Sequence, residues 1–293
     1  VSPFTWGFEL QTWHGVTYAA AMMALAGYCA RSLNKQIAIL VLLFAIFFYF
    51  GLTKMPWLAL LLIYSFAAWK VGGPKLGIGT FLGLGFLVVT GLWPEAMLSV
   101  YLCSIAVIIS FLLGTALGIW AASNEMVSAI LRPINDTLQT MPLFVILIPF
   151  VMIFKIGEFT ALLAIIAYAI VPAIRYSEHG LRNVPHEVIE AAECMGCNRW
   201  QLLWRVKIPL AIPEMMLGLN QTIMFGISML VIAALVGTSG LGQQVYIGLG
   251  DGDFGVGMTA GIGMAIIAII ADRMTAVWSV KLQERYTVAG DRP

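Results

Sequence analysis

A polar segment, residues 183–213, interrupts an otherwise apolar sequence and carries the side chains best suited to contact a partner protein. Carboxylates recur at every third residue on one side of its first predicted helix; they are Glu187, Glu190 and Glu193. Apolar and small residues at i, i+3, i+4 and i+7 form another side; they are Val188, Ala191, Ala192 and Met195. We expect Asn183 to cap this helix, with Pro185 in its first turn, and Gly196 to end it in a left-handed conformation.

A second short helix is predicted over residues 200–206. We expect Ile208-Pro209, together with Pro213, to end it, because proline removes a backbone donor. Two short helices joined at Gly196 form an elbow, a shape suited to the groove of a partner. The alternative is an ordinary loop with a solvated acidic face.

The spacing within the elbow is similar to the EAA motif of ABC importer permeases. That motif reads Glu-Ala-Ala, three residues, Gly, nine residues, then an aliphatic residue, any residue, an aliphatic residue and Pro. Every specified position is met here, by Glu190, Ala191, Ala192, Gly196, Val206, Ile208 and Pro209. The resemblance implies that the elbow couples the chain to a cytoplasmic ABC ATPase dimer. ATP and Mg²⁺ would bind to that partner, so this chain would bind no cofactor and would not be an enzyme.

Further segments narrow the resemblance to the glycine betaine and proline betaine, or ProU-type, branch of these permeases. They are residues 131–133, 139–142, 170–175, 218–222, 228–233, 240–243 and 272–273. The resemblance is specific from about residue 96 to the C-terminus. It implies a core of five helices, a second permease copy in a homodimer, and an extracytoplasmic substrate-binding protein that delivers the substrate.

The composition independently indicates an all-α, polytopic membrane protein. Hydrophobic residues make up 60% of the 293 residues and charged residues only 11%, with a mean hydropathy of +0.92. A soluble core could not bury so much apolar surface. The net charge of +1 gives no sign of a nucleic-acid partner.

Candidate transmembrane spans follow from length and apolarity. They are residues 12–30, 37–52, 55–69, 76–93, 96–122, 138–154, 159–176, 213–236 and 254–280. We predict N-terminal accessory helices over 1–93 and a permease core over 94–293. With the N-terminus outside, only Lys54 and Lys155 of the 16 Lys and Arg residues fall in outer loops. The positive-inside rule therefore favours a cytoplasmic elbow and C-terminus, and the resemblance implies the bacterial inner membrane.

Neutral polar residues inside the predicted core spans are candidates for a translocation path. They are Gln139 and Thr140, followed by Pro142, then Asn220, Gln221 and Thr222, and finally Ser228. Amides and hydroxyls in hydrocarbon need partners, so we expect these side chains to face the bundle interior or a water-filled cavity. The alternative, nearly as strong, is that they hydrogen-bond between helices and line no path.

A glycine-rich stretch after the predicted span 213–236 contains Gly237, Gly240 and Gly242. It lacks the Gly-Lys-Ser/Thr ending of a phosphate loop. We predict a hinge at an outer gate, with a simple turn as the alternative.

Cys194 and Cys197 have the spacing of a metal or redox pair, but a zinc site would need two more ligands. We therefore predict no metal site. Cys29 and Cys103 lie in predicted spans, and we interpret them as packing residues.

These observations predict the permease subunit of an ATP-driven importer for a methylated ammonium osmolyte or nutrient. Glycine betaine, proline betaine, choline and trimethylamine N-oxide are the substrates that the resemblance suggests. The alternatives are another ABC branch, such as methionine import, an ion-coupled secondary transporter, or a channel. A secondary transporter would use ionisable groups in the membrane. Asp272 and Arg273, which could neutralise each other, are the principal such pair.

Overall fold

The structure is a computed structural model that describes residues 57–287, with side chains as far as residue 280. The predicted spans 12–30 and 37–52, with Cys29, lie outside the described residues. The chain divides into two compact units, residues 1–64 and 65–293. The predicted division between residues 93 and 94 stays a prediction.

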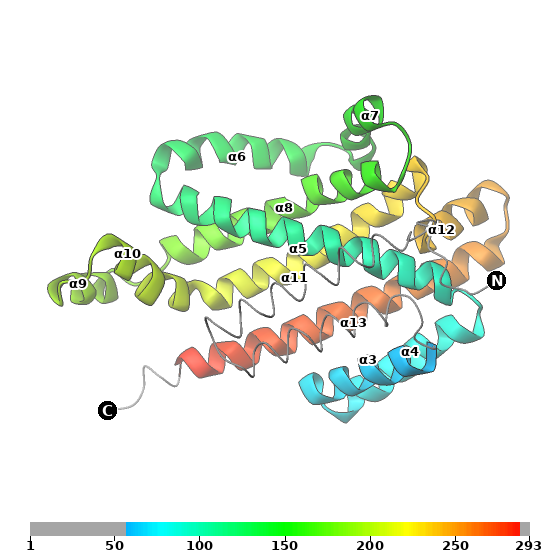
Figure 1. Cartoon of the computed structure of the whole chain (residues 1–293), viewed down its shortest axis with the longest axis horizontal. Coiled ribbons are helices and arrows are strands. Elements are labelled where there is room, and N and C mark those ends of the chain that lie inside the picture. Colours follow the sequence, from blue (N-terminus) through cyan, green and yellow to red (C-terminus); the bar gives the residue numbers. More distant parts are fainter. Residues whose placement is uncertain (1–56, 288–293) are drawn as a thin grey trace, which may run out of the picture. The chain divides into compact units, whose positions relative to one another are not determined.

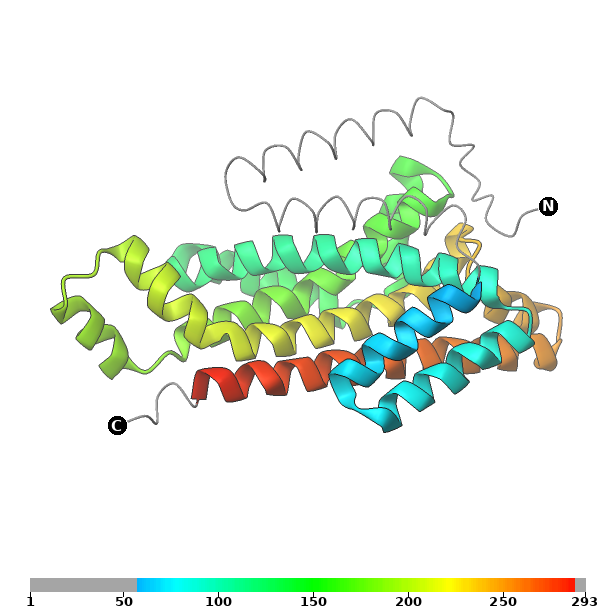
Figure 2. The same cartoon turned by 60° about the horizontal axis from the view of Figure 1, so that its bottom comes forward.

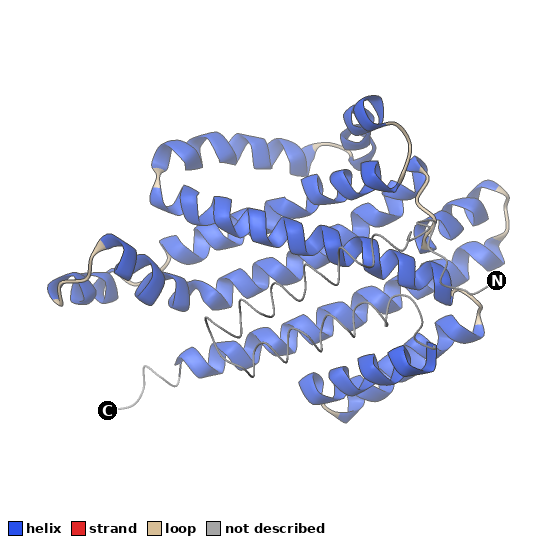
Figure 3. Cartoon of the chain, viewed as in Figure 1, coloured by secondary structure: helices blue, strands red, loops and turns tan. Residues whose placement is uncertain are grey.

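Every regular element in the described residues is a helix, as the composition predicts (Figure 3). In chain order they are α3 (Trp57–Gly72), α4 (Pro74–Val89), α5 (Trp93–Ser123), α6 (Glu125–Thr140), α7 (Leu143–Phe154), α8 (Glu158–Arg182), α9 (His186–Cys194), α10 (Arg199–Gln201), the π-helix η1 (Leu202–Lys207), α11 (Ile208–Ala233), the 3-10 helix η2 (Ala234–Val236), α12 (Leu241–Gly250) and α13 (Phe254–Thr287).

The second unit is built around α8, which packs along both α5 and α11 (Figure 1). Small residues allow these helices to approach closely. A Cβ on Gly118 of α5 would lie 2.6 Å from the Ile174 carbonyl oxygen, and one on Gly218 of α11 would lie 2.8 Å from the Tyr176 Cβ. Glycine at such crossings is typical of helix pairs in membranes, where close van der Waals contact replaces the hydrophobic driving force.

The predicted spans 96–122, 159–176 and 254–280 each fall inside one long helix, namely α5, α8 and α13. Within the described residues, four helices are long and apolar enough to cross a membrane, or five if a bent pair counts as one span. The predicted span 76–93 is wrong at its end, because α4 stops at Val89 and Trp93 already belongs to α5. Gly91, at φ +76°, makes the turn between them.

A sharp bend replaces the single span predicted over 138–154. Helix α6 ends at Thr140, α7 begins at Leu143, and their axes differ by 104°. The cause is Pro142, which has no backbone donor and disfavours the helical conformation in the residue before it. Met141 is accordingly extended, at φ −65° and ψ 136°.

The second elbow helix does not end at Ile208-Pro209 as predicted. A continuous helical stretch runs from Arg199 to Val236, with Pro209 in its interior. The wide π-turn η1 precedes the proline, and the Ile208 N–H bonds the Leu203 carbonyl five residues back. Pro209 then lies in the first turn of α11, where a missing donor is tolerated. A local change of helix type thus joins the elbow directly to a predicted span.

Replacing Gly118 with alanine should destabilise the unit, because the added methyl would collide with the α8 backbone. We expect a loss of roughly 1–3 kcal/mol, the usual range for overpacking, measured as a lower thermal midpoint in detergent. Gly261→Ala is the matched control, since a Cβ there meets nothing within 4 Å. That change should be neutral or stabilising; equal effects at the two positions would contradict this account of the α5–α8 contact.

Candidate functional site

The first helix of the elbow, α9, ends as its sequence predicts. Gly196 has φ +84°, its N–H bonds the Glu193 carbonyl at 2.9 Å, and the Cys197 N–H bonds the Ala192 carbonyl at 3.1 Å. This is the Schellman arrangement, which satisfies the last carbonyls of a helix and favours glycine at the left-handed position. A side chain with a Cβ at position 196 would strain the turn.

The predicted N-cap of α9 is wrong. Asn183 follows the last residue of α8, its amide contacts the His179 imidazole, and Pro185 occupies the capping position of α9. Helix α8 extends this far because its final turns pack on α11, where Gly180 lies close to Ala211. Tertiary packing therefore overrides the local capping preference of asparagine.

The elbow extends beyond the ends of α8 and α11 (Figure 1 and Figure 2). Its second half starts with a capping box: Asn198 Oδ1 accepts from the Gln201 N–H at 2.8 Å, and Gln201 Oε1 accepts from the Asn198 N–H at 3.0 Å. Both orphan donors are satisfied locally. Local hydrogen bonds therefore define both the end of α9 and the start of the second half of the elbow.

Much of the apolar surface of the elbow is exposed. On the predicted apolar side of α9, only Ala192 is buried, while Met195 remains 78% exposed. Trp200 and Trp204 stack on each other, yet remain 70% and 58% exposed. Glu190 is also exposed and pairs with His186 within α9. An ordered protrusion with an uncovered aromatic and apolar surface is typical of a protein-docking site.

A buried carboxylate that the sequence analysis did not identify holds α6 against α8 near the elbow. Glu178 accepts from the Ser128 hydroxyl at 2.6 Å and from Arg182 Nε at 3.0 Å. Arg182 also pairs with Glu125 and donates to the Ala121 carbonyl. A buried charge needs such partners. The i, i+4 spacing of Glu178 and Arg182 is a sequence signal that could have indicated it.

The first predicted path cluster lies at the bend between α6 and α7. Gln139 is half-buried, whereas Thr140 and Pro142 are exposed. The Thr140 hydroxyl donates to the Asp136 carbonyl of its own helix at 2.8 Å. Neither hydroxyl nor amide here is locked into a contact with another helix in the described residues.

The second predicted cluster divides between different surroundings. Asn220 donates to Asp272 Oδ1 at 2.9 Å and accepts from the Thr275 hydroxyl, so it connects α11 to α13. Thr222 is fully buried and bonds its own backbone at Gly218. Gln221 is half-buried and Ser228 is exposed. The role of this cluster in a path stays a prediction.

The expected neutralisation of Asp272 by Arg273 is not what the structure shows. In the described residues Asp272 accepts from Asn220, and its ion pairs do not include Arg273. Adjacent residues on a helix point in different directions, which explains why they do not face each other.

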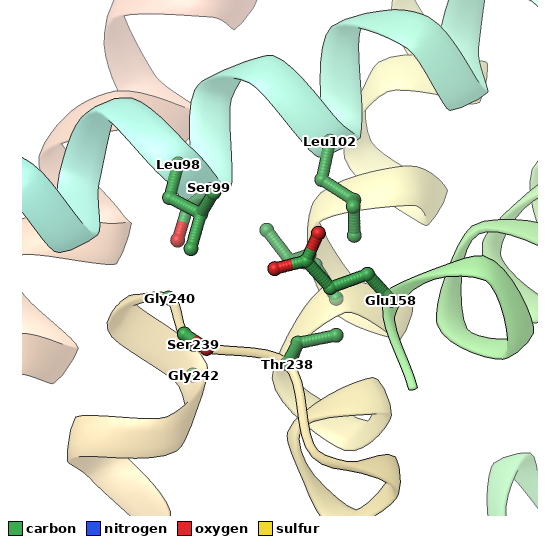
Figure 4. A pocket seen from close by; sticks show the side chains of 9 residues that line it. Leu98, Ser99, Leu102, Glu158, Thr238, Ser239, Gly240 and Gly242 are labelled. Carbon is green, nitrogen blue, oxygen red and sulfur yellow. The ribbon is translucent and has the colours of Figure 1, made fainter. Parts of the chain in front are cut away.

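The glycine-rich stretch closes against α5 and the start of α8 (Figure 4). Gly237, at φ +84°, follows the end of η2. Gly240, the residue before α12, lies so close to α5 that a Cβ on it would be 2.4 Å from Ser99 Oγ. Ser99 Oγ also accepts from the Leu241 N–H at 2.8 Å, and Gly242 is buried in α12. A small pocket beside this contact is lined by Glu158, whose carboxylate points into it. Glycine is needed at 240 because a side chain would collide with Ser99, and it is favoured at 237 because φ is positive there. Hinge motion stays a prediction.

This arrangement of long apolar helices with a protruding, glycine-closed elbow defines a membrane transport permease. Residues 114–283 match the family described as binding-protein-dependent transport system inner membrane component, and the chain belongs to that family. It is a multi-pass membrane protein. The resemblance inferred from the EAA motif is confirmed.

The chain is similar in sequence to betaine permeases of other bacteria. It is 38% identical over 224 residues to the glycine betaine/proline betaine transport system permease protein ProW of Escherichia coli (strain K12), covering 76% of this chain and 63% of that protein. It is 40% identical over 237 residues to the glycine betaine transport system permease protein OpuAB of Bacillus subtilis (strain 168), covering 80% and 83%. The chain thus spans less than two thirds of the length of the first of these relatives.

A solved structure shares the fold. The MetNI methionine ABC transporter, in an inward-facing conformation, matches with a TM-score of 0.56 over 67% of this chain and 96% of that one. At 22% identity this likeness shows the fold alone. The predicted all-helical fold class is therefore confirmed.

The Asn220 contact can be tested by a change that removes its amide. Asn220→Leu should lower stability by roughly 1–3 kcal/mol, because the Asp272 carboxylate would lose its hydrogen-bond donor between two membrane helices. Ser228→Ala, which removes only a hydroxyl bonded to its own helix, should change stability by less than about 0.5 kcal/mol. Thermal unfolding of both variants in the same detergent is the measurement. An unchanged thermal midpoint for Asn220→Leu would argue that this hydrogen bond does not stabilise the packing of α11 on α13.

Proposed function

We propose that this chain is the transmembrane permease subunit of an ATP-driven importer for a methylated ammonium solute of the glycine betaine type. The observation that carries the proposal is the ordered, exposed elbow, which has every position of the EAA motif in a chain of the permease family. The names of the relatives, which specify glycine betaine and proline betaine transport, support the substrate class.

The elbow is proposed to dock into a cytoplasmic ATPase dimer that binds ATP and Mg²⁺. Exposed apolar and aromatic surface on α9 and α10 gives the partner a contact that excludes water. The helical stretch from Arg199 to Val236 is uninterrupted, so it can transmit a movement of the elbow to the membrane span. A displacement of the elbow would move α11 with it, instead of being absorbed in a flexible loop. The chain itself would catalyse no reaction.

The remaining partners follow from the same proposal. A second permease copy would complete the translocation path, and an extracytoplasmic binding protein would deliver the solute. The orientation, with the elbow and C-terminus in the cytoplasm and the N-terminus outside, rests on the distribution of Lys and Arg between predicted loops.

Two variants test the elbow. Glu190→Lys reverses an exposed charge, and Gly196→Val places a β-branched residue at φ +84°, a strained conformation for any residue with a Cβ. Both should insert and fold, yet lose co-purification with the ATPase and reduce ATP-dependent glycine betaine uptake into vesicles by about tenfold or more.

Asp251→Lys is the matched control for ATPase retention, since it reverses an exposed charge in the turn between α12 and α13, outside the elbow. Normal uptake and normal ATPase retention in both test variants would refute the coupling role. Uptake by wild type without ATP or without the ATPase would instead indicate a channel or an ion-coupled transporter.

The proposed division at residues 93 and 94 predicts that a chain starting at Trp93 still recruits the ATPase. It should be less stable, because α4 packs on α13: Leu87 lies beside Gly263, and Gly83 beside Ile266. Co-purification of the shortened chain with the ATPase is the measurement. A shortened chain that inserts but recruits no ATPase would place the boundary elsewhere.

A further inference from the structure

One face of α8 carries polar and aromatic side chains that the neighbouring helices cover only in part. Helix α8 contacts α5 through Ser177, α11 through Tyr176 and α6 through Glu178. Tyr168, Arg175 and His179, spaced i, i+7 and i+11, share a different face. Tyr168 is half-buried, whereas Arg175 and His179 are exposed.

An aromatic pair lies at one end of this face. The Tyr168 ring stacks on Phe225 of α11, with centroids 4.9 Å apart and planes 25° from parallel. Gln221, one turn earlier on α11, is also half-buried. Aromatic faces attract methylated ammonium groups through cation–π interaction, and a neutral amide can replace water around a polar solute without trapping it.

An open ion pair lies at the other end. Arg175 of α8 pairs with Asp136 of α6, and their side chains remain 43% and 66% exposed. Gln139 and Thr140 follow Asp136 by three and four residues, so they lie on neighbouring positions of α6. Charged groups in a membrane protein face lipid only at a high cost, so an exposed pair indicates contact with water, solute or protein.

We propose that this face of α8, with Phe225 and Gln221 of α11 and Asp136 of α6, is a transit site for a zwitterion with a methylated ammonium and a carboxylate. The ammonium lies against the Tyr168–Phe225 pair, and the carboxylate takes the place of Asp136 at the Arg175 guanidinium. This inference rests on the proposed function. It names substrate-contacting residues, three of which the sequence analysis did not single out: Tyr168, Arg175 and Phe225.

The two ends lie on one face of α8, so a small zwitterion that moves along this face would meet both in succession. Arg175 follows Tyr168 by two helical turns, roughly 10 Å along the axis. Because the Asp136 side chain is 66% exposed, water can solvate its carboxylate when a substrate carboxylate takes its place at Arg175.

The test uses the complete transporter, permease with ATPase and binding protein, in vesicles supplied with ATP. Tyr168→Leu and Arg175→Gln should lower the maximal glycine betaine uptake rate about tenfold, the size of one lost cation–π or ionic contact. Tyr168→Phe and Arg175→Lys should keep most of the rate, because they retain the ring face or the charge. The concentration of loaded binding protein that half-saturates uptake should stay unchanged.

Two matched controls separate recognition from stability. Arg132→Gln breaks another ion pair between α6 and α8, with Glu178, and Phe159→Leu disrupts another ring pair, with Phe154, at the start of α8. Both should transport within about twofold of wild type. Normal transport by Tyr168→Leu and Arg175→Gln, or an equal loss in the controls, would overturn the transit site.

Two further outcomes are distinguishable. An assembled wild-type complex that hydrolyses ATP but takes up no glycine betaine would refute the proposed function itself. If a second permease copy covers this face, a cysteine at Gln221, with the four native cysteines replaced, would cross-link between copies and resist a water-soluble thiol reagent in every state. That result would also overturn the transit site, while leaving the importer function intact.

Discussion

The close contact of α8 with both α5 and α11 is the constraint on which the other features depend. Glycines on the facing helices bring the backbones together, as at Gly118 and Gly218. Because α8 is fixed on two sides, its other faces have defined surroundings. One side holds the buried Glu178 against α6, and another presents Tyr168 and Arg175. The elbow then starts from the end of a helix that cannot easily shift.

Proline has opposite effects at two points of the chain, and the difference has a physical cause. At Met141-Pro142 the helix breaks by 104°, because Met141, the residue before the proline, has an extended conformation. At Pro209 the helix continues, because the π-turn before it changes the bonding pattern and leaves the proline in a first helical turn. The first site produces a bend beside Gln139 and Thr140. The second links the elbow to α11.

The sequence predicted the all-helical class, the long helices and the left-handed Gly196, because these depend on apolar length and on local backbone chemistry. It failed at Asn183 and at the end of the second elbow helix, where packing of α8 on α11 and a change of helix type decide the outcome. It also missed Glu178 and the Tyr168–Phe225 pair. The Ser128 partner of Glu178 and the Phe225 partner of Tyr168 lie on other helices, and no spacing along one segment indicates contacts between segments far apart in the chain.

The polar residues of α11 differ in the helix face that they occupy. Asn220, Asp272 and Thr275 satisfy one another between α11 and α13, so that network holds helices together. Gln221, the next residue after Asn220, lies about 100° around the helix and faces away from that network. It is on the side of α11 where Phe225 meets Tyr168. One short polar run can therefore contribute to stability on one face and to solute contact on another. The hydrogen bonds of Asn220 fit the interpretation as a contact between helices, whereas a role of Gln221 in a path stays a prediction.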